Sequence, residues 1–237
     1  GAAVTLVTES MPPQTRGYGT AVVAGVGLFG AVAAALVAKN FHWRTAYIIG
    51  GVLGLALLAL RLRMFESGLY ESVRGAGVKR GDVTMLVSPP ARLFKYVRCI
   101  LIGVPIWFVV GILVTSAPEF AAAFHAPGVT PPLKEITAGG AVLYTYIGLA
   151  VGDLTSGALS QALRTRRKVV AGYLLFTAAL VALYLTLDRP STNAFYALCG
   201  AMGFGIGYWA VFVTVAAEQF GTNLRATVAT SVPNFVR

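Results

Sequence analysis

Charge, histidine and cysteine are all scarce in this chain. Charged residues make up 12% of its 237 residues, about half the share usual in soluble domains, which argues against a soluble fold. The two histidines and two cysteines stand far apart in the sequence, without the ligand spacing of a metal site. We therefore expect no metal and no cofactor, and two free, buried thiols at Cys99 and Cys199.

Long apolar runs dominate what remains, since hydrophobic residues make up 57% of the sequence. Six stretches carry no acidic or basic residue: 17–38, 45–60, 99–118, 136–152, 169–187 and 191–217. About 20 such residues suffice for a helix to cross a bilayer. In lipid the backbone must satisfy its hydrogen bonds within the segment, so each run is expected to be helical. The sequence predicts an all-α polytopic membrane protein.

The net charge of +10 is concentrated in two loops. Residues 61–98 and 153–168 hold most of the arginines and lysines, whereas residues 117–135 and 188–193 hold few. Basic residues stay on the cytoplasmic side of a membrane, so the first two loops are expected to face inward and the other two outward. This distribution explains the charge without nucleic acid as a partner. We expect a multi-pass protein of the cell (inner) membrane, monomeric, with the bilayer as its surroundings.

The two ends of the chain fall inside apolar runs. The sequence opens at Gly1 within a run that stops at Glu9, and it closes at Arg237, soon after a run begins at Ala226. We interpret the chain as a fragment, truncated at both ends.

A short pattern recurs at the two ends. Thr5, Glu9 and Arg16 reappear 209 residues later as Thr214, Glu218 and Arg225. In each copy an apolar run leads to the Glu, and a second apolar run follows the Arg. Repeated halves in a membrane chain are typical of transporters built from two related helix bundles.

Glycine clusters within the apolar runs admit a less specific interpretation. Residues 25–30, GVGLFG, match the dinucleotide fingerprint, but that motif functions after a strand and these residues lie in the middle of a predicted span. Close packing of helices explains them better. The same holds for Gly200, Gly203, Gly205 and Gly207, which also permit a bend.

The basic loop carries a family resemblance. Residues 152–168, GDLTSGALSQALRTRRK, resemble the signature loop of the major facilitator superfamily, roughly G-x-L-S-D-R-x-G-R-R-K. The matching positions are Gly157, Leu159, Ser160 and residues 166–168. Gln161 and Ala162 replace the usual Asp and Arg, and one extra residue precedes the basic cluster. Asp153, one helical turn before the motif, offers a carboxylate in its place.

Four further segments resemble the same family in the expected order. The two Glu-x6-Arg patterns look like the turns after its fourth and tenth helices. Residues 41–47, FHWRTAY, resemble the W-R-x-x-[FY] start of the sixth helix, and residues 65–67, FES, resemble P-E-S-P-R of the sugar-porter and metabolite–proton symporter branches, without its prolines. The resemblance implies that the chain runs from part of helix four to part of helix eleven of the family fold. Residues 1–60 would then form the end of the first helix bundle, residues 61–98 the cytoplasmic linker and residues 99–237 the second bundle.

This resemblance implies transport of a small organic solute, a sugar or an organic acid, by alternating access. Proton symport and uniport both remain open, because the six spans contain no ionisable residue in their interiors. A coupling carboxylate within this chain would have to be an edge residue such as Glu119 or Asp153. The alternative is a non-transporting sensor or a membrane-embedded enzyme, although the sequence shows no catalytic constellation.

Two sets of residues are expected to serve transport. Charged groups at cytoplasmic helix ends would pair when that side closes, unless the basic cluster only fixes topology. The expected gate is Asp153, Arg164, Arg166, Arg167, Glu218, Arg225, Glu9 and Arg16. Aromatic rings with a polar handle, and one amide, suit a substrate cavity. The expected cavity residues are Trp107, Tyr144, Tyr146, Tyr208, Trp209 and Asn234.

Overall fold

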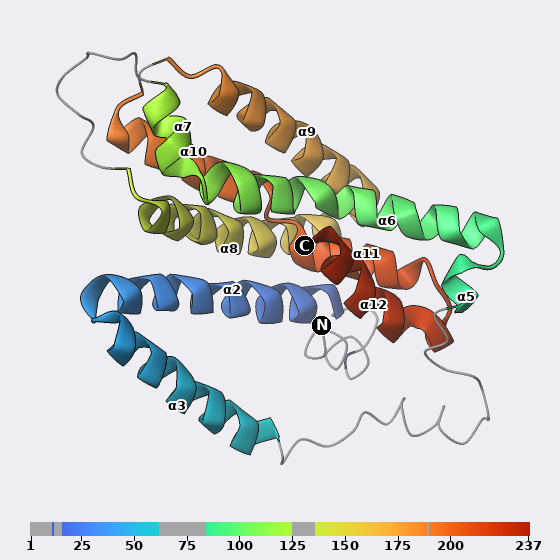
Figure 1. Cartoon of the computed structure of the whole chain (residues 1–237). Helices are drawn as coiled ribbons and strands as arrows, with labels where there is room; N and C mark the ends of the chain where they lie inside the picture. Colours follow the sequence, from blue (N-terminus) through green and yellow to red (C-terminus); the bar gives the residue numbers. More distant parts are fainter. Residues whose placement is uncertain (1–10, 12–15, 62–83, 125–135, 189) are drawn as a thin grey trace.

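The computed structural model describes residues 11, 16–61, 84–124, 136–188 and 190–237, and this part of the chain is helical throughout (Figure 1). The elements in chain order are α2 (Arg16–Asn40), α3 (Trp43–Arg61), α5 (Thr84–Val87), α6 (Pro90–Phe108), η1 (Val109–Val114), α7 (Ala117–Ala123), α8 (Ala138–Ala162), α9 (Arg166–Leu185), α10 (Thr192–Gly205), α11 (Trp209–Glu218) and α12 (Thr222–Val236). The predicted all-α class is confirmed. Because η1 is a π-helix that directly continues α6, the two form one rod.

Among the described residues, five helical stretches are long and apolar enough to cross a membrane: Trp43–Leu60, Pro90–Val114, Ala138–Ala162, Arg166–Leu185 and Thr192–Glu218. A shorter apolar helix runs over Gly25–Asn40 within α2. Two of these helices begin at hydroxyl caps, with Thr137 accepting from the N–H of Gly140 at 3.1 Å and Ser191 from that of Ala194 at 3.3 Å.

Two predicted boundaries were wrong. The third span begins at Pro90 rather than residue 99, and the fourth ends at Ala162 rather than residue 152. In both cases hydropathy failed because the helix continues through polar residues. Pro90 suits a first helical turn, where its missing N–H costs nothing. In α8 the polar residues Asp153, Ser156 and Ser160 are buried against neighbouring helices.

Glycines bring α8 and α10 into direct backbone contact. A Cβ at Gly148 would overlap the carbonyl group of Gly200, and one at Gly203 would overlap that of Thr145. The packing interpretation is thus confirmed for this pair, and the predicted bend is present, because α10 ends at Gly205 and α11 starts at Trp209. Small residues are what allow membrane helices to approach so closely.

The contact between α2 and α8 joins segments far apart in the sequence (Figure 1). At Gly25 a Cβ would lie 2.8 Å from the side chain of Leu154, whereas at Gly27 and Gly30 it would meet nothing within 4 Å. Only the first glycine of the fingerprint-like run therefore faces a helix within the described structure. By contrast, none of the span in α3 is buried within the described structure.

Cys99 and Cys199 are free and buried, as the sequence predicted. Each behaves as a small apolar side chain in its helix.

The charge-based topology leads to a labelling prediction. A cysteine at the exposed Ser191, before α10, should react with an impermeant maleimide added outside intact cells, and one at the exposed Ala162, at the end of α8, should not. The reason is that basic loops stay inside. Other accessible cysteines would first be replaced. Labelling of Ala162→Cys but not Ser191→Cys would reverse the orientation.

Candidate functional site

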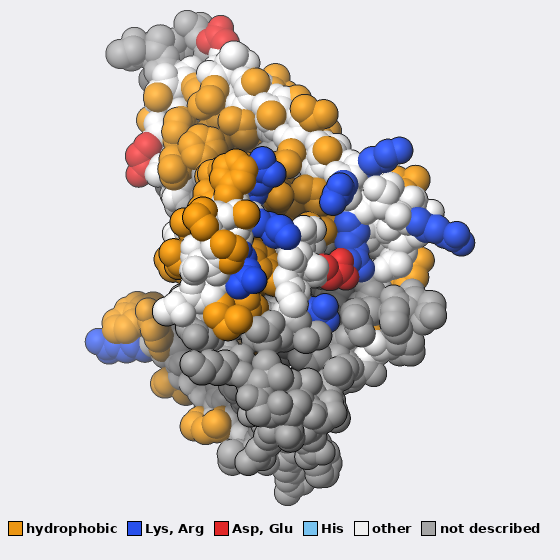
Figure 2. Space-filling model, turned by 90° about the vertical axis from the view of Figure 1, so that its right-hand side faces the viewer, with side chains coloured by type: hydrophobic (Ala, Val, Ile, Leu, Met, Phe, Trp, Pro, Cys, Tyr) orange, Lys and Arg blue, Asp and Glu red, His pale blue; other side chains and the backbone are white. Residues whose placement is uncertain are grey.

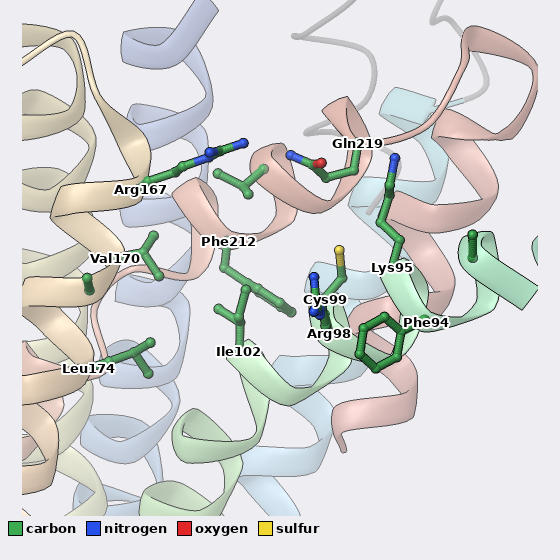
Figure 3. A pocket seen from close by; sticks show the side chains of 13 residues that line it. Phe94, Lys95, Arg98, Cys99, Ile102, Arg167, Val170, Leu174, Phe212 and Gln219 are labelled. Atoms are coloured by element: carbon green, nitrogen blue, oxygen red, sulfur yellow. The ribbon is translucent and has the colours of Figure 1, made fainter.

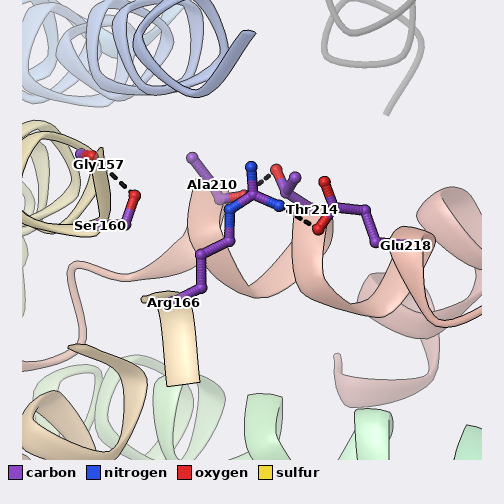
Figure 4. Close-up of polar contacts among 6 residues, drawn as sticks. All are labelled: Gly157, Ser160, Arg166, Ala210, Thr214 and Glu218. Atoms are coloured by element: carbon purple, nitrogen blue, oxygen red, sulfur yellow. Dashed lines mark hydrogen bonds and ion pairs between the residues drawn. The ribbon is translucent and has the colours of Figure 1, made fainter. Parts of the chain in front are cut away.

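The ends of α8, α9 and α11 surround a polar cavity of about 380 Å3. Its lining residues are Ser160, Gln161, Arg164, Arg166, Arg167, Val215, Glu218 and Gln219. Arg166 at the start of α9 donates from Nη1 to Oε2 of Glu218 at the end of α11, an ion pair between two helices (Figure 4). The side chains are 24% and 41% exposed, so water weakens this pair without removing it.

Hydroxyl groups beside the ion pair are satisfied within their own helices. Ser160 donates to the carbonyl of Gly157 at 2.7 Å, and Thr214 donates to that of Ala210 at 2.7 Å (Figure 4). Ser160 belongs to α8 and Thr214 to α11, the helix that carries Glu218, and neither hydroxyl donates to the ion pair.

The remaining basic residues of the expected gate have different surroundings. Arg164 is exposed at the turn after α8, where its φ of 51° lies in the left-handed region typical of a helix end. The Nε of Arg225 is buried and has no hydrogen-bond partner among the described residues. Among those residues Glu218 pairs with Arg166 and not with Arg225. Glu9 and the side chain of Arg16 lie outside the described residues, as does the superposition of the two repeats.

Arg167 also lines a neighbouring groove of about 460 Å3 between α6, α9 and α11 (Figure 3). Ile102, Leu174 and Phe212 form part of its apolar lining, and Lys95 and Arg98 add further positive charge. The guanidinium of Arg98 stacks 4.1 Å from the ring centre of Phe94. Figure 2 shows Lys and Arg side chains gathered on this end of the molecule. The described basic residues of the two predicted inner loops thus meet at one end of the bundle.

Asp153 lies apart from these arginines, although the sequence grouped it with the gate. Its side chain is 0% exposed, and Oδ1 accepts a hydrogen bond from the N–H of Ala210 at 2.8 Å. The carboxylate therefore caps the start of α11. Oδ2 is buried and has no hydrogen-bond partner among the described residues.

The position of Asp153 also corrects the expectation that the spans contain no ionisable residue in their interiors. It precedes the end of α8 by nine residues, about 14 Å along the axis, and so lies within the span. A buried carboxylate costs several kcal/mol. A charge-assisted hydrogen bond returns about 1.5–3 kcal/mol, and a helix N-terminus at most about 2 kcal/mol. The cost of burial and these two favourable contributions are of similar size. Whether Asp153 is ionised therefore depends on how close the N-terminus of α11 lies to its carboxyl group.

Three of the expected cavity residues gather at a second place. Trp209 and Asn234 line a cavity of about 130 Å3 together with Arg237. The ring of Trp107 meets that of Trp209 edge to face at 6.2 Å, and the guanidinium of Arg237 lies 4.8 Å from the ring centre of Trp107. The Nε1–H of Trp107 is buried without a partner among the described residues. This cluster combines aromatic faces, an unused donor and a cation.

The expected tyrosines are not brought to this cluster. Tyr144 stacks on Tyr196 at 5.1 Å, near the start of α8. Tyr146 is partly buried and packs against the core of the bundle. Tyr208 is fully buried, and its hydroxyl donates to the carbonyl of Ile102 at 2.9 Å, so it serves as packing at the helix break.

Sequence reasoning missed Arg237. It follows α12 directly, 15 residues after Thr222, which is about 22 Å along the helix. That distance places it well within the thickness of a bilayer, about 30 Å for the hydrocarbon core. The signal was present, since an arginine within an apolar run is a candidate functional residue.

Comparisons with known proteins agree with the membrane architecture. A sequence model described as Major Facilitator Superfamily matches residues 1–233. The chain is 27% identical over 242 residues to the 3-(3-hydroxy-phenyl)propionate transporter of Escherichia coli strain K12, covering 97% of this chain and 55% of that protein. It is 24% identical over 245 residues to the putative niacin/nicotinamide transporter NiaP of Bacillus subtilis strain 168, covering 99% and 58%. The chain thus spans about half the length of these relatives. No solved structure matches it significantly.

Proposed function

The chain belongs to the major facilitator superfamily, and from this premise we propose that it carries a small aromatic carboxylic acid across the cell (inner) membrane by alternating access. Both relatives named above are transporters rather than enzymes. One is named for a phenylpropionate and the other for niacin and nicotinamide, so an aromatic ring recurs in all of these names and a carboxylate in two of the three compounds.

The cluster of Trp107, Trp209, Asn234 and Arg237 carries this proposal. Arginine presents a planar fork that matches a carboxylate with two parallel hydrogen bonds. The two indole rings supply faces on which an aromatic ring stacks, and Asn234 supplies an amide at the same cavity. A cavity of about 130 Å3 is small for a whole substrate, so we assign it to one end of the ligand.

Uptake into membrane vesicles that contain the intact transporter tests this function. Labelled nicotinate and 3-(3-hydroxyphenyl)propionate are expected to enter faster than nicotinamide or glucose, because only the acids can pair with Arg237. Nicotinamide is the matched control for nicotinate, since it keeps the ring and replaces the carboxylate by a neutral amide. Uptake of glucose without either acid would show instead a sugar transporter.

The Arg166–Glu218 pair is proposed as a gate on the cytoplasmic side. The pair joins the start of α9 to the end of α11, and an opening movement would separate these two helices. A polar cavity lies next to the pair. Because partly exposed ion pairs contribute about 0.2–1 kcal/mol, the pair biases the closed state by a factor of up to about five.

Glu218→Gln is therefore expected to lower the transport rate by up to about five-fold. Its free energy of unfolding should change by no more than about 0.5 kcal/mol. Initial uptake rates and thermal unfolding of the purified protein measure the two effects. Arg167→Gln is the matched control, because Arg167 is on the same helical turn and lacks the ion pair with Glu218. The double variant Arg166→Glu/Glu218→Arg should recover part of the rate. A parental rate in Glu218→Gln contradicts the gate.

A further inference from the structure

We propose that Asp153 binds a proton inside the membrane, and that transport is coupled to the uptake and release of this proton. The inference rests on the proposed transport function and adds the coupling ion to it. It does not depend on the identity of the substrate, because Asp153 does not line the cavity of Trp209 and Arg237, although Trp209 begins the helix that Asp153 caps.

The carboxylate of Asp153 has one free position for a proton. Oδ1 is occupied by the N–H of Ala210 at 2.8 Å, whereas Oδ2 is buried and has no hydrogen-bond partner among the described residues. Among those residues no Lys, Arg or His forms an ion pair with it. A proton that adds to Oδ2 turns the carboxylate into a neutral acid and leaves the hydrogen bond at Oδ1 in place.

The groups that face Asp153 from neighbouring helices do not supply a counter-charge. From α9, the hydroxyl of Tyr173 donates to the carbonyl of Gly152 at 3.1 Å. From the break before α11, Tyr208 lies against Tyr173, and its hydroxyl donates to the carbonyl of Ile102. From α2, Gly25 lies against the side chain of Leu154, the residue after Asp153, and residues 22–29 around it include no titratable residue.

The short helix α11 connects this site to the gate. Asp153 caps its first turn through Ala210, and Glu218, which pairs with Arg166, is its last residue. A movement of α11 that opens the ion pair also changes the distance between its N-terminus and the buried carboxylate. Separation removes the donor and the positive end of the helix dipole from Asp153, which favours the protonated form. The gate and the proton site therefore act on one another through a single rigid element.

Infrared difference spectroscopy of the intact, purified transporter tests proton binding without any substrate. Spectra at mildly acidic and mildly alkaline pH are subtracted, and the carbonyl band of a protonated carboxylic acid is compared between the parent protein and Asp153→Asn. Asparagine keeps an oxygen that accepts from Ala210 but cannot take up a proton. We expect the parent to show a band that is missing in Asp153→Asn. A band that persists in the variant, or no titrating band in the parent, overturns the proposal.

A second measurement covers the case in which Asp153→Asn fails to fold. Dicyclohexylcarbodiimide reacts with protonated carboxyl groups in apolar surroundings, and mass spectrometry locates the adduct in the parent protein. Modification of Asp153 that falls as pH rises is the expected result, and an unmodified Asp153 at acidic pH contradicts the proposal.

The coupling itself is tested in proteoliposomes with labelled nicotinate. Asp153→Asn should retain exchange of internal for external nicotinate and lose accumulation driven by a proton gradient. Accumulation at the parental level in the variant rejects coupling through Asp153. If the parent moves no nicotinate at all, the proposed substrate is wrong, and the infrared result still decides whether Asp153 binds a proton.

Discussion

Replacement of Gly203 with valine is expected to prevent stable packing of α8 against α10. A Cβ at this position would overlap the backbone carbonyl of Thr145 on α8, and backbone atoms cannot turn aside as a side chain can. Overpacking in a core costs about 1–3 kcal/mol even where side chains relax. Because α8 and α10 touch through their main chains, the cost here should exceed that range and lower the yield of folded protein several-fold.

Size-exclusion chromatography and thermal unfolding in detergent measure the effect on Gly203→Val. Gly172→Val is the matched control, because a Cβ at Gly172 on α9 meets nothing within 4 Å. This variant should elute and unfold like the parent. Parental behaviour of Gly203→Val would mean that the close approach of α8 and α10 is not required.

Replacement of Arg237 with glutamine is expected to raise the KM for nicotinate by about ten- to one-hundred-fold. A hydrogen bond to a charged group contributes about 1.5–3 kcal/mol, and each 1.4 kcal/mol is a factor of ten. Glutamine keeps a donor at this position but loses the charge and the two-pronged geometry. The KM of Arg237→Lys should lie between those of the parent protein and Arg237→Gln, since lysine retains the charge but not the two-pronged geometry.

Concentration-dependent uptake in vesicles gives these constants. Arg167→Gln removes one positive charge at the basic end of the bundle and controls for a general electrostatic effect on an anionic substrate. The KM of Arg167→Gln should stay within about two-fold of the parental value, because an exposed charge is largely screened by salt. An unchanged KM in Arg237→Gln removes Arg237 from the substrate site, whatever the substrate preference of the transporter.

The sequence alone was sufficient for the architecture. Six apolar runs near the required length were predicted as spans, because lipid leaves the backbone no alternative to the helix, and within the described residues five of them are helices long and apolar enough to cross a membrane. The motif at residues 152–168 and the other family-like segments indicated the family, which the match over residues 1–233 bears out. The sequence also brought together Arg166 and Glu218, two residues that the structure places in contact, because their positions at helix ends follow from the span boundaries.

Only the tertiary structure decided where the interior charges lie. Hydropathy ended the fourth span before Asp153, because it scores each residue as though it faced lipid. In the folded bundle this carboxylate faces the start of α11, which supplies a donor from 57 residues away. The same reasoning applies to Arg237 and Trp107, which meet across α12 and α6 although they are distant in sequence. Spans follow from local composition, whereas the surroundings of a buried charge depend on helices that pack together only once the chain has folded.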